Sequence, residues 1–120
     1  MKFKSNVRMY DFSDPAVMLI LQVVQHTAPD GYEPTITSAN DSKHMPHSLH
    51  YKNRAFDIRV KDYPGFNLWR FEKTKKVIFE WIKRMRKFLP VAEYDIIFGD
   101  AHHKNHIHIE FDPIHHYRSI

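Results

Sequence analysis

The chain has 120 residues and a formal net charge of +4, with 42% hydrophobic and 14% aromatic residues. This length and composition predict one globular domain, residues 1–120, with one modest core, and they exclude a disordered chain. Cysteine is absent, which excludes disulfides and thiolate metal sites, so any metal would need histidine and carboxylate ligands.

Seven elements follow from the local patterns of the chain. In order they are a short edge strand at 2–4, a helix at 15–27, strands at 35–38 and 54–60, a helix at 68–89, a strand at 94–98 and a last strand from residue 106. Asp14 and Pro15 are typical of the N-cap and first residue of a helix, and Pro90 closes the second helix. This order predicts an α+β fold in which a small antiparallel sheet packs against two main helices.

The second predicted helix is amphipathic. Its apolar residues at helical spacing predict a core stripe: Phe71, Ile78, Ile82, Met85 and Leu89. Its basic residues lie off that stripe: Lys73, Lys76, Lys83, Arg84 and Lys87. A solvated face explains such a pattern more often than a nucleic-acid surface does, so we expect no specific nucleic acid partner.

The last strand carries the most informative pattern. Nine of the ten histidines gather in two windows of the chain, and two of them lie one residue apart in this strand. Residues 106–111 alternate between apolar and polar, which predicts that His106, His108 and Glu110 face away from the core. Side chains two residues apart on a strand lie about 7 Å apart, close enough for one histidine to hold a metal and the other to act beside it.

A second cluster lies in the middle of the chain. His50 leads into the strand at 54–60, where Phe56, Ile58 and Val60 predict the core face and Asp57 lies on the polar face. One histidine of the last strand would complete a set of two histidines and one carboxylate from adjoining strands. Three protein ligands leave the fourth tetrahedral position of a zinc ion to water, as catalytic zinc sites require. We therefore expect a zinc site on the open face of the sheet.

The middle cluster resembles a motif of the M15 zinc peptidases, S-x-H-x-x-G-x-A-x-D. Ser48, His50, Ala55 and Asp57 match it, and Asn53, which tolerates positive φ, replaces the glycine. The family includes D-alanyl-D-alanine carboxypeptidases, L-alanyl-D-glutamate endopeptidases and many phage endolysins, and it shares a wider group with the hedgehog signalling domain. The resemblance covers about residues 34–112.

The second family motif ends in H-x-H on a strand, and His106 and His108 resemble it. The resemblance implies that zinc is bound by His50, Asp57 and His108.

The resemblance also implies candidates for proton transfer. Many members place an acidic general base where this chain has Asn105, whereas murein endopeptidases have an H-x-x-H-x-H form that His103, His106 and His108 match. On that template His106 or His103 acts as base or stabilises the transition state, and Asp100 is a weaker candidate.

Substrate contacts are a further expectation from the resemblance. Many members hold the substrate carbonyl or carboxylate with an arginine, at a position where this chain has Asp41. The candidates to contact substrate here are Ser48, Lys43, His44 and Arg59.

The resemblance implies a zinc-dependent carboxypeptidase or endopeptidase that hydrolyses peptide bonds in bacterial peptidoglycan. The positive net charge suits a polyanionic cell wall. We expect the protein to be a monomer whose partner is a peptidoglycan peptide substrate. We expect no membrane association. Since no signal peptide is recognisable, we expect synthesis in the cytoplasm with release at lysis, or carriage on a virion, as for a phage lysis enzyme.

Two other interpretations stay open. Replication-initiator and relaxase endonucleases also carry a metal-binding His-hydrophobic-His strand, and the basic helix suits DNA. Their nucleophilic tyrosine would have to be Tyr117, close to the chain end, and the pattern at 48–57 would be unexplained. The other interpretation is a zinc-binding module without catalysis, and Asn105 at the acidic position is its best support.

Overall fold

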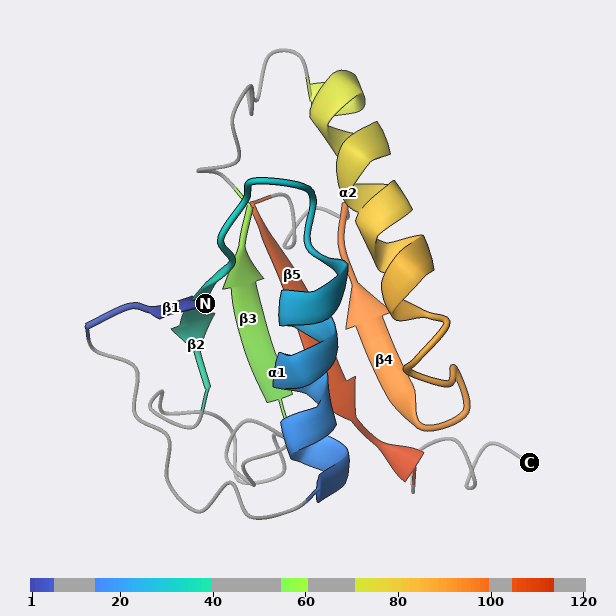
Figure 1. The fold of residues 1–120 in the computed structure, drawn as a ribbon. Coiled ribbons are helices and arrows are strands. Elements are labelled where there is room, and N and C mark those ends of the chain that lie inside the picture. The colour runs from blue at the N-terminus through green and yellow to red at the C-terminus, as the bar shows by residue number, and fades with distance from the viewer. Residues whose placement is uncertain (6–14, 40–54, 61–70, 100–104, 114–120) are drawn as a thin grey trace.

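The computed structural model describes residues 1–5, 15–39, 55–60, 71–99 and 105–113 (Figure 1). Its elements are β1 (Lys2–Phe3), α1 (Pro15–Thr27), β2 (Thr35–Ser38), β3 (Ala55–Arg59), α2 (Phe71–Met85), β4 (Tyr94–Ile97) and β5 (His106–Phe111). The predicted α+β class, with one sheet and two helices, is confirmed. Neither helix within these ranges has both the length and the apolar character needed to cross a membrane.

The five strands form one sheet in the order β1-β2-β3-β5-β4. The pairs β2–β3, β3–β5 and β5–β4 are antiparallel, as predicted, but β1 runs parallel to β2. The sheet is therefore mixed, and the prediction of an antiparallel sheet is wrong at this edge. The connection from β1 to β2 contains α1, and a helical crossover of this kind is what lets two neighbouring strands run in the same direction.

Both helices contribute to a core on one face of the sheet, and Figure 1 shows α1 crossing in front of β3 and β5. The inward side chains of β3 and β5 are fully buried: Phe56, Ile58, Ile107 and Ile109. Each such side chain stabilises the fold by roughly 1.5–3 kcal/mol relative to exposure. The alternation predicted for both strands is confirmed, and it leaves their polar side chains on the face that no described helix covers.

The second helix is shorter than predicted. It spans Phe71–Met85, and the chain then forms turns up to Leu89 instead of continuing as helix. Ile78, Met85 and Leu89 are fully buried, which confirms most of the predicted stripe, and Ile82 is partly buried. The first residues of the predicted range, 68–70, lie outside the described residues, as does the side chain of Phe71.

Trp81 is a core residue of α2 that the predicted stripe missed. Its side chain is fully buried, and its Nε1–H donates to Thr27 Oγ1 at 3.1 Å. The hydroxyl of Thr27 in turn donates to the Val23 carbonyl at 2.6 Å. Arg84, predicted to be solvated, is partly buried and donates from Nε to the Thr27 carbonyl at 3.1 Å. These contacts fix the C-terminal end of α1 against α2.

Candidate metal centre

The register between β3 and β5 brings the polar side chains of both strands to the same face. Asp57 is directly opposite His108, and Arg59 is directly opposite His106. Opposed residues on neighbouring strands share a face, with Cβ atoms about 4.5–5.5 Å apart. Two residues far apart in the sequence, Asp57 and His108, are therefore neighbours because two strands pair.

Asp57 and His108 make a close polar contact on this face. The Nδ1 atom of His108 lies 2.8 Å from Oδ1 of Asp57, and the two side chains are only 14% and 20% exposed. On the other side of the ring, Nε2 lies 3.4 Å from Oε2 of Glu110. Both ring nitrogens of His108 are thus directed at carboxylates from two strands.

The surroundings of His108 change its proton affinity. Burial of the imidazole opposes the charged form, but hydrogen bonds and attraction from Asp57 and Glu110 outweigh it and raise the pKa of His108 to about 9. Without a metal, the ring is therefore a cation between two anions at neutral pH. A divalent cation bound between His108 Nδ1 and Asp57 would displace the proton from Nδ1 and pair directly with the Asp57 carboxylate.

The spacing of these donor atoms fits a metal ligand pair. Nitrogen and oxygen ligands about 2.1 Å from a tetrahedral zinc ion are about 3.4 Å from each other. The observed 2.8 Å between His108 Nδ1 and Asp57 Oδ1 needs a separation of only about half an ångström to admit an ion. A metal-bound histidine usually donates its other N–H to a carboxylate, and Glu110 occupies that position.

His106 lies on the same face, one alternate position earlier in β5. Its Nδ1 contacts Asn105 Oδ1 at 2.9 Å, and its Nε2 lies 4.0 Å from Asp57 Oδ1. A carboxamide oxygen only accepts, so Nδ1 carries the hydrogen in this contact. In the neutral ring Nε2 is then the basic nitrogen, and it points toward the Asp57 side of the site.

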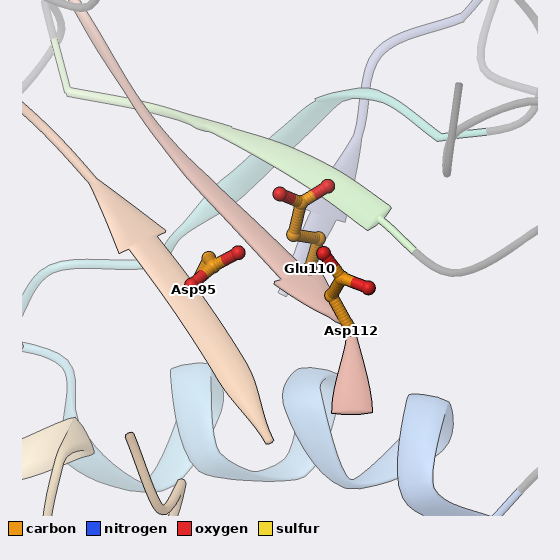
Figure 2. A group of neighbouring side chains, drawn as sticks. All are labelled: Asp95, Glu110 and Asp112. Carbon is orange, nitrogen blue, oxygen red and sulfur yellow. The ribbon is translucent and has the colours of Figure 1, made fainter. Parts of the chain in front are cut away.

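A second group of possible ligands lies at the other end of β5, and the sequence analysis missed it. Asp95, Glu110 and Asp112 each offer a carboxylate oxygen, and these atoms lie within 4.8 Å of one another (Figure 2). Asp95 is opposite Glu110 in the β4–β5 pairing, and Asp112 continues the same alternation. The three carboxylates could hold a metal ion, although groups of accessible acids often occur without one. Only Glu110 had a signal in the sequence, through the alternation of β5; Asp95 joins it through the register of β4 on β5.

The structure brings together some of the predicted site residues. Asp57, His106, His108 and Arg59 share one face of two paired strands. The other predicted residues lie outside the described ranges: the zinc ligand His50, the catalytic candidate His103, and Ser48, Lys43, His44, Asn53 and Asp100. The described part of the site therefore contains two of the three expected ligands, His108 and Asp57. The imidazole of His106 lies beside them.

The chain was compared with protein families, curated proteins and solved structures. No family model, no curated protein and no solved structure matches the chain. The functional argument therefore depends on the residues of the chain and on their geometry.

Proposed function

We propose that the chain is a zinc-dependent peptidase that hydrolyses peptide bonds of bacterial peptidoglycan. The observation that carries the proposal is the 2.8 Å contact between His108 Nδ1 and Asp57 Oδ1 across the β3–β5 pair. The two donors belong to the two motifs on which the M15 resemblance depends. Without their pairing, one imidazole and one carboxylate could not bind the same ion.

His50, Asp57 and His108 would hold the zinc ion in this proposal. Zinc bound there would act as a Lewis acid toward the scissile carbonyl and make hydroxide available near neutral pH. Glu110 would keep the ring of His108 oriented through Nε2, from which it lies 3.4 Å. Ile107 and Ile109, both fully buried, fix the strand that carries these side chains.

His106 would move the proton in this reaction. Asn105 holds its Nδ1, so the opposite nitrogen, Nε2, is the atom that can accept a proton. Nε2 lies 4.0 Å from a carboxylate oxygen of Asp57, within one water molecule of the metal-binding pair. Asn105 itself offers no carboxylate, so the position that is acidic in many M15 peptidases orients the base here instead of acting as one.

Two measurements test the proposal on the full chain. Zinc content after purification is compared between the wild type and the variants Asp57→Ala and His108→Ala, with His26→Ala as a control because His26 is an exposed histidine on α1. Cleavage of purified peptidoglycan is then followed by separation of the released peptides, with and without a chelator. We expect about one zinc ion per wild-type and His26→Ala chain, strong loss in both site variants, and cleavage that chelation abolishes.

Other results would select another function. Full zinc content in both site variants would remove Asp57 and His108 as ligands. Bound zinc without cleavage of any wall substrate would favour a binding module of the same fold. Metal-dependent nicking of single-stranded DNA would favour the endonuclease that also uses a His-hydrophobic-His strand.

A further inference from the structure

A polar pocket lies beside the candidate metal centre, at the start of β5. Its volume is about 180 Å³, and its lining residues come from four neighbouring strands or their ends: Lys4, Thr37, Arg59, Asn105 and His106. The sheet order β1-β2-β3-β5 brings these strands side by side. Lys4, Arg59 and the NH₂ group of Asn105 can donate hydrogen bonds to a ligand, and the first two carry a fixed positive charge. The Thr37 hydroxyl already donates to the Asp57 carbonyl at 3.4 Å, and Nδ1 of His106 donates to Asn105.

One atom of the Arg59 guanidinium group, Nε, lacks a hydrogen-bond partner within the described structure. This atom is buried. Among the described residues, neither Arg59 nor Lys4 forms an ion pair. The salt bridges near the N-terminus instead join the Met1 amino group and Lys2 to Glu33. The terminal NH₂ groups of the same guanidinium form no ion pair among the described residues, so an anion in the pocket that Arg59 lines could pair with them in a charge-assisted hydrogen bond.

The neighbouring groups do not neutralise this charge. No carboxylate lines the pocket among the residues that the structure describes. Asp57, two residues before Arg59 on the same face of β3, is hydrogen-bonded to His108. Asn105 uses its side-chain oxygen for His106, which leaves its NH₂ group as the end that can serve a ligand. The described lining residues of the pocket thus carry an excess of donors and of positive charge.

We propose that this pocket binds a small oxyanion, with Arg59 as its anchor. The planar guanidinium group matches the oxygen atoms of phosphate or carboxylate, and Lys4 adds a point charge at the open side. Two fixed positive charges favour a doubly charged phosphate over a singly charged carboxylate. The site requires no metal ion, so it stands independently of the proposed zinc chemistry.

The test is a titration of the full chain with inorganic phosphate, followed by NMR of the backbone amides at constant ionic strength set with chloride. The protein is used as purified and after passage over a chelating resin, because phosphate also binds zinc. We expect saturable shifts at Thr37, Asn105 and His106 in both preparations. A second titration with acetate in place of phosphate distinguishes the two ligand groups. Tighter binding of phosphate identifies a phosphate site, and tighter binding of acetate identifies a carboxylate site.

Three variants locate the binding. Arg59→Gln should weaken phosphate binding by roughly tenfold or more, and Lys4→Gln should weaken it several-fold. Lys76→Gln, at an exposed position of α2, should bind as the wild type does. Because Lys4 is exposed, its variant is informative even if Arg59→Gln fails to fold. Absence of saturable binding in the wild type, or equal binding by the Lys4 and Lys76 variants, would overturn the proposal.

Discussion

The protonation of His108 makes the stability of the metal-free protein depend on pH. The pKa of His108 is raised from its ordinary value of 6.5 to about 9 in the folded protein. The folded state therefore holds this proton more tightly than the unfolded chain does. The contribution is fully present below about pH 6.5 and is lost as the pH rises through 9. A difference of about 2.5 pKa units corresponds to about 3 kcal/mol, and the His108 side chain is 14% exposed, so solvent screens it little.

Urea unfolding between pH 6 and pH 10 measures this contribution after the metal has been removed. The quantity to compare is the difference in free energy of unfolding between the wild type and His108→Gln, in which the contributions of other titrating groups cancel. This difference should fall by about 3 kcal/mol as the pH rises from about 6 to about 10. Zinc added at pH 8 should displace about one proton per ion bound, because His108 must lose its proton to become a ligand. A difference that stays constant with pH, or that grows as the pH rises, would refute the assigned contacts with Asp57 and Glu110.

Three further predictions concern His106, Trp81 and Gly99. His106→Ala should keep its zinc but lose roughly a hundredfold or more in peptidoglycan cleavage, which metal analysis and turnover of the same sample would check; unchanged turnover would exclude His106 from the mechanism. Trp81→Phe should lower the free energy of unfolding by about 1–3 kcal/mol in urea, because it removes the hydrogen bond to Thr27 and leaves a gap in the core. Gly99→Ala should cost about 1–2 kcal/mol in the same assay, because φ is 95° and a Cβ atom would lie 3.3 Å from Lys75 Cε.

The local sequence pattern was sufficient to predict the strands that carry the candidate site and the orientation of their side chains. Alternation over 106–111 and 54–60 predicted which side chains face the core, and Ile107, Ile109, Phe56 and Ile58 are all fully buried. The period of two is imposed by the strand itself, so it can be recognised without knowledge of the partner strand. The same reasoning placed His106, His108 and Asp57 on the polar face.

Features that depend on distant partners could not be predicted in the same way. The parallel pairing of β1 with β2 is set by the crossover through α1, and two residues at the chain start give no signal of direction. The group of Asp95, Glu110 and Asp112 requires the register of β4 on β5, which no single strand specifies. Trp81 is different: it lies three residues after Ile78 and four before Met85, so helical spacing alone could have placed it in the core stripe. Only the acceptor of its buried N–H, Thr27 of the other helix, depended on the tertiary structure.

The hydrophobic core and the candidate metal centre both depend on the register of β5 between β3 and β4. A slip by one residue would turn Ile107 and Ile109 toward solvent and His108 toward the core, because side chains alternate between the two faces. The burial of both isoleucines therefore holds His108 on the polar face that it shares with Asp57, and this part of its placement does not depend on the polar contacts. It follows that substitutions such as Asp57→Ala can alter metal binding while the strand stays in register, which is the condition under which zinc content and cleavage report on the site and not on the fold.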